Sequence, residues 1–192
     1  MLSFQPHIED LVATERLRPL RRVEYDRLVE DGFFDEDEKI ELLDGVIVQM
    51  TPQGIGHAAA IERLTQVLVL ALVPRARVRV QLPYAASDVS EPEPDVAVVP
   101  PGDPERSHPD RSLLLVEVAE SSLAKDRRVK TRIYAAAGVP EYWIVDVAGR
   151  TIEVRTDPAE GSYRRVRIAR PGETIRLQAF PDVEIAVSDV VR

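Results

Sequence analysis

The chain has 192 residues, of which 44% are hydrophobic and 30% charged, which is typical of a globular protein and excludes a disordered one. Its formal net charge of -8 gives no general attraction to phosphates, so any contact with nucleic acid has to be local. The absence of cysteine excludes disulfides and thiolate metal sites, and leaves carboxylates and three histidines as candidate metal ligands.

The first half of the chain is predicted to contain a lead-in, a helix, a hairpin and a longer helix. Residues 1–20 are expected to be irregular and lack the pattern of a signal peptide, so we expect a cytoplasmic protein. The predicted elements are a helix at Arg22–Asp31, hairpin strands at Lys39–Leu43 and Val46–Met50, and a helix from His57 to about Leu72. Gly32 and Pro74 would end the helices, and Asp44-Gly45 favours a tight hairpin turn.

The second half is predicted to contain many strands and one helix. The strands are expected at Ala76–Leu82, Asp95–Val99, Leu113–Ala119, Tyr142–Val147, Thr151–Arg155, Tyr163–Ala169, Thr174–Leu177 and Val183–Val187. The helix is expected at Ala124–Ala137. The most continuous apolar segments, Val67–Val73 and Leu113–Val116, are too short to cross a bilayer, so no membrane partner is expected. This order predicts an α/β (α+β) fold with one central sheet, in a single domain over residues 1–192.

Three acidic residues lie on or beside predicted strands. Glu117 follows the apolar run Leu113–Val116, where a buried charge is costly unless a cation or a metal ion pairs with it. Asp95 precedes the apolar strand residues Val96–Val99, so adjacent strands would bring Asp95 and Glu117 together at one end of the sheet. Glu41 lies on the hairpin. Oxygen-rich clusters of this kind bind Mg²⁺ or Mn²⁺.

Each of these residues also has an ordinary structural interpretation. Glu41 alternates with Ile40 and Leu42, so it could simply face solvent. Asp95 follows a proline and could belong to a turn or a cap. Glu117 could form a salt bridge with one of the many arginines. A metal site is therefore indicated by the three residues together and by none of them alone.

The last predicted helix carries a polar stripe. Asp126, Lys130 and Tyr134 are spaced by four residues and share one face. The stripe could be solvated, or it could point toward the strand end, where a lysine would hold an attacking water or neutralise a phosphate. Lysine occurs only at Lys39, Lys125 and Lys130, so each lysine is of interest.

These residues resemble the Uma-two family of bacterial proteins, described as putative restriction endonucleases. The matching blocks are ELLDGVIVQMTP at 41–52, His57, EPDVAVV with Asp95, LLVEVAESS with Glu117, Lys130 with Tyr134, and GVPEYWIVD at 138–146. The resemblance covers roughly residues 22–190. The family belongs to the PD-(D/E)XK nuclease-like superfamily, which implies a restriction-endonuclease-like fold with a mixed central sheet flanked by helices. It also implies metal-dependent endonuclease hydrolysis of phosphodiester bonds in DNA, with Mg²⁺ or Mn²⁺ as cofactor.

The resemblance assigns roles to individual residues. Asp95 and Glu117 match the two acidic metal ligands, and the Val118 carbonyl is a further candidate ligand. Glu41 matches the acidic residue that precedes them. Asp95, Glu117, Lys130 and Glu41 are therefore the implied catalytic residues.

The superfamily pattern E-x-K departs from this sequence at one position. It places a lysine where this chain has Ala119, and the resemblance implies that Lys130 replaces it. His57, Asp126 and Tyr134 are accessory or substrate-binding candidates.

Two other functions are compatible with the residues. A nuclease-like domain could bind nucleic acid without cutting it, as Ala119 and the negative charge would favour, through arginines at 127, 128, 132, 164, 165 and 167. Paired carboxylates could instead hydrolyse glycosides, but only 5% of residues are aromatic, which is little for a sugar-binding platform.

Trp143 is expected in the core or at a subunit contact. A homodimer is a further expectation, because one small acidic domain offers little surface to grip a duplex.

Overall fold

The fold is built on a six-stranded sheet. The structure is a computed structural model, and it describes residues 14–35, 37–103 and 106–192. In spatial order the strands are β3 (Arg77–Val80), β4 (Val96–Val99), β5 (Leu114–Ala119), β6 (Glu141–Asp146), β7 (Thr151–Ala159) and β8 (Ser162–Ala169). Neighbouring strands are antiparallel except β5 and β6, which are parallel. The sheet is therefore mixed.

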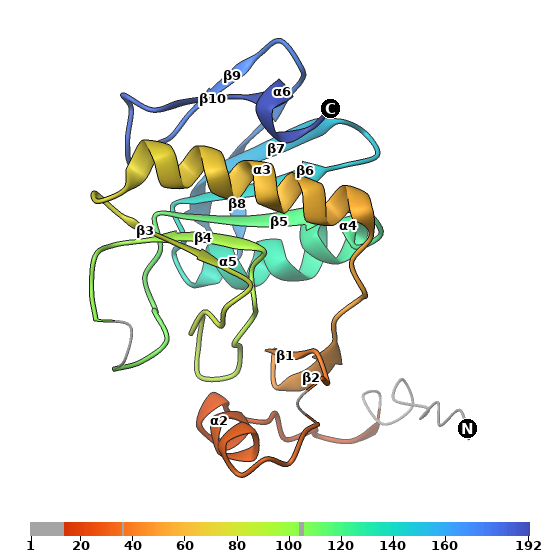
Figure 1. Cartoon of the computed structure of the whole chain (residues 1–192). Helices are drawn as coiled ribbons and strands as arrows, with labels where there is room; N and C mark the ends of the chain where they lie inside the picture. The colour runs from red at the N-terminus through yellow and green to blue at the C-terminus, as the bar shows by residue number, and fades with distance from the viewer. Residues whose placement is uncertain (1–13, 36, 104–105) are drawn as a thin grey trace.

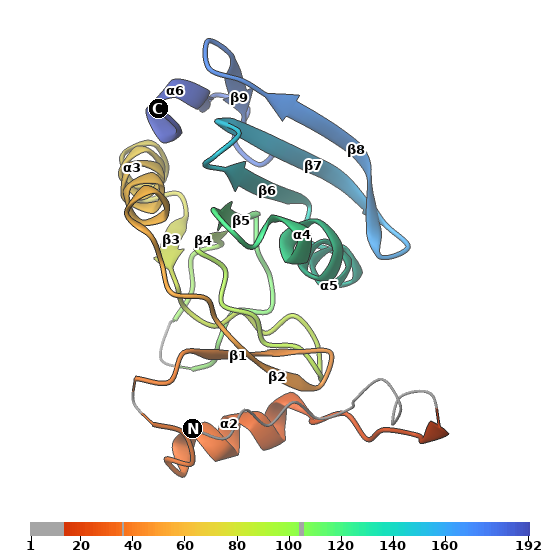
Figure 2. The same cartoon turned by 90° about the vertical axis from the view of Figure 1, so that its right-hand side faces the viewer.

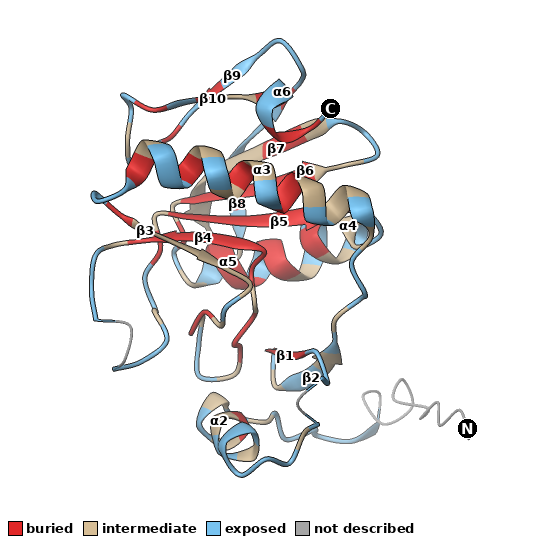
Figure 3. Cartoon of the chain, in the orientation of Figure 1, coloured by how far each residue is buried: buried red, intermediate tan, exposed pale blue. Residues whose placement is uncertain are grey.

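Helices cover both faces of this sheet (Figures 1 and 2). One face carries α3 (Ile55–Leu72), the short helix α6 (Val187–Val190) and a two-stranded sheet of β9 (Thr174–Arg176) and β10 (Glu184–Ala186). The other face carries α4 (Leu123–Lys125), the π-helical turn η1 (Asp126–Lys130) and α5 (Thr131–Ala136). Figure 3 shows β4 and β5 buried along their length between these layers.

Helix α3 belongs to the core. It is long and apolar enough to cross a membrane by length and composition alone. Its residues Ala60, Leu64, Leu68 and Leu72 are fully buried and belong to the same hydrophobic cluster as Val96 and Val116 of the sheet. These residues form the face of α3 that packs on the sheet, whereas Ile55 and Leu70 are exposed, so α3 is buried along one face only.

A small unit lies beyond one end of the sheet (Figure 2). It consists of α2 (Arg22–Glu30) and the hairpin β1 (Ile40–Leu43) and β2 (Val46–Gln49). All four residues of β1 are buried. The N–H of Glu91 donates to the Leu42 carbonyl at 2.8 Å, which attaches β1 to the segment that leads into β4. This attachment brings Glu41 of β1 close to the sheet.

The predicted fold class is confirmed, with differences in detail. The hairpin and the β9–β10 pair form separate two-stranded sheets, whereas one central sheet was predicted. Strand β7 continues to Ala159, beyond the predicted end at Arg155, because Pro158 and Ala159 still pair with β8. Of the predicted lead-in, residues 1–13 lie outside the described part of the chain, and residues 15–20 contain no helix or strand.

Glu91 is a buried carboxylic acid at this attachment. Among the described residues, its Oε2 atom has no hydrogen-bond partner, and the Arg22 guanidinium lies 3.7 Å away. Burial is the main cause that raises the pKa of Glu91 to about 7, and the charge of Asp26 adds to it while Arg22 opposes it. The folded protein therefore holds the Glu91 proton more tightly than the unfolded chain does.

We expect Glu91→Gln to raise the free energy of unfolding above pH 7. The pKa of Glu91 in the folded protein lies above the ordinary value of 4.5. The contribution of Glu91 to the free energy of unfolding is therefore complete below pH 4.5 and is lost as the pH rises to about 7. At 1.36 kcal/mol for each pH unit, the loss amounts to up to about 3 kcal/mol. Urea unfolding between pH 5 and 8 measures it, with Glu62→Gln, an exposed residue of α3, as control. An unchanged pH slope in Glu91→Gln would contradict this expectation.

Candidate active site

A pocket of about 650 Å³ lies between the end of the sheet and the unit formed by α2 and the hairpin. Its lining includes all three lysines of the chain, Lys39, Lys125 and Lys130. Its acidic lining residues include Glu41, Glu93, Asp95, Glu117, Glu120 and Asp126. The pocket therefore collects the rare lysines and the predicted acidic residues in one place.

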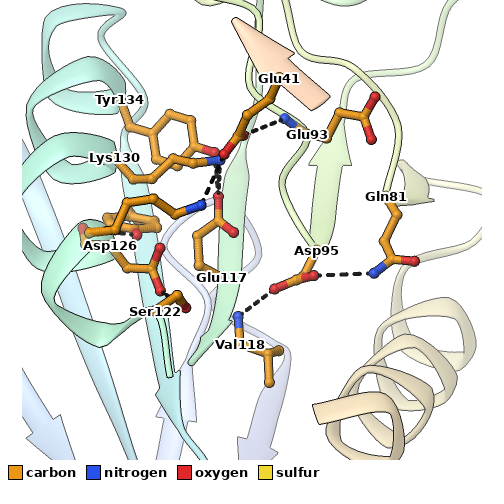
Figure 4. Close-up of polar contacts among 12 residues, drawn as sticks. Glu41, Gln81, Glu93, Asp95, Glu117, Val118, Ser122, Asp126, Lys130 and Tyr134 are labelled. Atoms are coloured by element: carbon orange, nitrogen blue, oxygen red, sulfur yellow. Dashed lines mark hydrogen bonds and ion pairs between the residues drawn. The ribbon is translucent and has the colours of Figure 1, made fainter. Parts of the chain in front are cut away.

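The strand register brings Asp95 and Glu117 together. Strands β4 and β5 pair Val96 with Val116, so the next pair outward places Asp95 directly opposite Glu117. Their exposed fractions are 8% and 6%, so both lie at the inner end of the pocket. The predicted meeting of these two carboxylates at one end of the sheet is seen in the structure (Figure 4).

Hydrogen bonds fix both oxygens of Asp95. The backbone N–H of Val118 donates to Oδ2 at 2.7 Å, and the Gln81 amide donates to Oδ1 at 3.3 Å. His57 Nε2 lies 3.1 Å from the same Oδ1. The hydrogen bond to Asp95 is the main cause that raises the pKa of His57, while burial opposes the rise. His57 and Val118, both predicted site residues, therefore contact Asp95.

Glu117 is held by two side chains from the helical layer (Figure 4). The Tyr134 hydroxyl donates to Glu117 Oε1 at 2.5 Å, and the Lys130 ammonium lies 3.1 Å from the same oxygen. Burial is the main cause that raises the pKa of Glu117 to about 8; Lys130 opposes the rise, and the charges of Asp126 and Asp95 add to it. Glu117 is thus a buried carboxyl whose partners come from the helix that follows it.

Lys130 comes from the helical layer, whereas the superfamily pattern places its lysine at position 119 of β5. Ala119 faces the same side as Glu117 and is buried in the cluster beneath the helical layer. Lys130 projects from that layer and reaches Glu117 from the opposite wall. The helical layer therefore places an ammonium group beside Glu117.

The predicted helix over Ala124–Ala137 is present, and its middle part, η1, is a π-helical turn. The Thr131 N–H donates to the Asp126 carbonyl, five residues back. That carbonyl also accepts from the Thr131 hydroxyl at 2.8 Å and from the Tyr142 hydroxyl at 3.2 Å. These extra donors stabilise the wider turn, which carries both Asp126 and Lys130 into the buried side of the layer.

Glu41 is paired with two lysines. Lys130 Nζ lies 2.5 Å from its Oε2 and Lys125 Nζ lies 3.0 Å from its Oε1. Burial alone would raise the pKa of Glu41, but the two lysines outweigh it and lower the pKa. The possibility that Glu41 faces solvent is excluded, because its side chain is 1% exposed.

Lys125 is a site residue that the sequence did not single out. Its side chain is 30% exposed, whereas that of Lys130 is 2% exposed. Lys125 can therefore meet a ligand that enters the pocket while it remains paired with Glu41. The available signal was its rarity, since it is one of only three lysines in the chain.

Asp126 lies at the edge of the group. Its Oδ2 accepts from the Ser122 hydroxyl at 2.6 Å, so the Asp126–Lys130 pair that helical spacing would allow is not formed. Burial is the main cause that raises its pKa, and the charges of Lys130 and Lys125 oppose the rise. Asp126 therefore adds negative charge near Glu117 without contacting it.

The donor atoms suit a hard divalent cation. Within the described ranges, no group of three His, Asp or Glu side chains is arranged so that it could hold one metal ion. Mg²⁺ needs fewer protein ligands, because it keeps several waters and commonly uses one or two carboxylates. Asp95 and Glu117 supply two carboxylates on opposed strand ends. Glu41 fits less well, since a lysine occupies each of its oxygens.

Comparison with known proteins identifies the family. The Uma2 family, described as "Putative restriction endonuclease", matches residues 22–188, and a search of curated proteins finds no match. A crystal structure of a putative nuclease belonging to DUF820 from Anabaena variabilis superposes with a TM-score of 0.68 at 17% identity, covering 90% of this chain and 97% of that chain. This likeness shows a shared fold. Family and fold together support a nuclease, and the family implies binding of nucleic acid. Because the family match spans most of the chain, the protein belongs to the Uma2 family.

Proposed function

We propose that the protein is a metal-dependent endonuclease that hydrolyses phosphodiester bonds in DNA. The observation that carries this proposal is the opposition of Asp95 and Glu117 in a pocket that also contains the partly exposed Lys125. Two carboxylates and a lysine at one point match the needs of phosphodiester hydrolysis, where a cation and a positive side chain offset the charge of the phosphate.

Asp95, Glu117 and the Val118 carbonyl are the residues that would hold Mg²⁺ or Mn²⁺. The bound ion supplies an acidified water and stabilises charge on the phosphate oxygens. His57 and Gln81 orient Asp95, and Tyr134 orients Glu117.

Lys130 and Lys125 have different roles in the proposed site. Lys130 is enclosed between Glu41 and Glu117, so it neutralises these carboxylates and fixes their positions. Lys125 is partly exposed in the pocket, so it is the lysine that meets a phosphate of the substrate. Glu41 holds both lysines in place and is a positioning residue rather than a metal ligand.

We expect Lys125→Gln to lower kcat/KM for DNA cleavage by about a hundredfold, the typical cost of removing one group that stabilises transition-state charge. The free energy of unfolding should change by less than about 1 kcal/mol, because Lys125 is partly exposed and Glu41 keeps Lys130. Arg128→Gln, an equal loss of charge at an exposed position in the same turn, should leave cleavage unchanged. Equal effects of the two substitutions would remove Lys125 from the site.

The arginines considered for a domain that binds without cutting are partly engaged elsewhere. Arg127 Nε donates to Glu153 at 2.6 Å, Arg132 pairs with Asp44, and Arg167 lies 3.2 Å from Glu173. These pairs lower the number of arginines free for phosphates and favour the pocket as the point of contact.

Cleavage of end-labelled DNA by the purified protein tests the proposal. We expect cleavage with Mg²⁺ or Mn²⁺ and none with EDTA. Calorimetric titration with Mn²⁺ separates the two alternatives. Binding of Mn²⁺ is expected of an enzyme. Binding of nucleic acid without binding of Mn²⁺ and without cleavage would indicate a domain that only binds.

A further inference from the structure

The pocket has an apolar wall beside its charged end. The wall consists of side chains from α2, the segment after it and the segment after β2: Tyr25, Val29, Phe34, Met50 and Pro52. None of these residues carries a charge, and none has a role in the chemistry proposed above. A volume of about 650 Å³ lies within the range of small-molecule sites, so the pocket is large enough to enclose more than a phosphate.

Phe34 is the aromatic ring of this wall that a ligand can reach. Its ring centroid lies 6.1 Å from that of Tyr25, which is buried and whose hydroxyl points to the Ile40 carbonyl at 3.4 Å. Phe34 itself is only partly buried and lines the pocket. Tyr25 and Phe33, whose ring centroid lies 5.3 Å from that of Phe34, both pack against Phe34, which lines the pocket.

The apolar wall adjoins the charged end. Ile40, which Tyr25 contacts, is the chain neighbour of Glu41, and the Glu41 carboxylate accepts from the Glu93 N–H at 3.3 Å. Burial raises the pKa of Tyr25 to about 12, and the charges of Glu93, Glu91 and Glu41 add to the rise. The aromatic wall therefore lies within the field of Glu41 and Glu93, two acidic residues that also line the pocket.

The depth of the carboxylates limits what can reach them. Asp95 and Glu117 are nearly buried, so a scissile phosphate has to enter the pocket, and the adjoining nucleoside enters with it. A base that remains paired in a duplex is held against its partner strand and cannot follow. The net charge of -8 also offers little support for docking a whole duplex on the surface.

We propose that the substrate is single-stranded DNA, with one unpaired base stacked on Phe34 and the adjoining phosphate at Lys125. This inference rests on the proposed function, since it names the substrate of the same pocket. Stacking on an aromatic side chain is tolerant of base identity, so we expect little sequence preference at this position.

Binding of matched single-stranded and duplex DNA to the Glu117→Gln variant, followed by fluorescence anisotropy, tests the inference without requiring cleavage. We expect the single strand to bind more tightly than the duplex. Phe34→Ala should weaken binding of the single strand about tenfold to a hundredfold, the loss typical of one base–aromatic stack. Phe34→Trp should retain it, and Phe180→Ala is the matched control, because Phe180 is also partly buried and does not line the pocket.

Two results would overturn the inference: tighter binding of the duplex, or equal effects of Phe34→Ala and Phe180→Ala. Thermal unfolding of the Phe34→Ala variant shows whether it folds normally. If it does not, Phe34→Leu is used instead, because leucine keeps the apolar contact with Tyr25 but cannot stack on a base. Failure of the proposed function gives a different result, namely no cleavage of either DNA by the wild type with Mn²⁺. Cleavage of duplex DNA alone would support the proposed nuclease activity and reject single-stranded DNA as the substrate.

Discussion

Replacing Lys130 with methionine should lower the free energy of unfolding by about 3–5 kcal/mol, the usual cost of removing one partner from a buried ion pair. Lys130 is completely enclosed, and its ammonium contacts Glu41 at 2.5 Å and Glu117 at 3.1 Å. Methionine fills a similar volume, so the loss comes from leaving Glu117 without a cation and Glu41 with Lys125 alone. Urea unfolding at pH 7 measures the change.

Two further variants separate this electrostatic cause from a packing defect. The triple variant Lys130→Met, Glu41→Gln, Glu117→Gln removes the buried charges together and should recover most of the lost stability. Lys39→Met changes the exposed lysine of the same pocket and should leave stability within about 1 kcal/mol. A fully stable Lys130→Met protein would show that the pairs contribute nothing.

The second large effect is expected on activity. Glu117→Gln should lower cleavage of DNA by at least about a thousandfold, the upper end of the cost of removing one electrostatic group from an active site. The amide has the size of the carboxylate and still accepts from Tyr134 and Lys130, so the fold should be unchanged. Metal-dependent cleavage and circular dichroism measure the two expectations.

A matched control is available on the neighbouring strand. Glu141 is also buried, but its oxygens accept from the Trp143 indole and the Gln178 N–H, both at 2.8 Å, outside the pocket. Glu141→Gln should keep normal cleavage. Normal cleavage by Glu117→Gln would reject Glu117 as a metal ligand.

Part of the site followed from the sequence because the cost of burying charge is general. A carboxylate at the end of an apolar strand needs a cation, and Glu117 has one in Lys130. The juxtaposition of Asp95 and Glu117 followed from the expectation that their strands are adjacent. Trp143 is fully buried, as one of its two expected placements required.

Other features depend on tertiary contacts that local patterns do not contain. The alternation of Glu41 with Ile40 and Leu42 suggested a strand with one solvated face, but the whole of β1 is buried. The π turn is supported by Tyr142, which lies 16 residues beyond Asp126 in the chain. Lys125 meets Glu41 across 84 residues, a separation at which spacing carries no information.

The position of the metal ion is the most direct test of the proposed site. A crystal grown with Mn²⁺ would locate the ion by its anomalous scattering. We expect one peak between the carboxylates of Asp95 and Glu117, close to the Val118 carbonyl, and its loss in Glu117→Gln. A protein that takes up no Mn²⁺ there at saturating concentration, or that binds it elsewhere, would contradict the assignment of this pocket as a metal-dependent nuclease site.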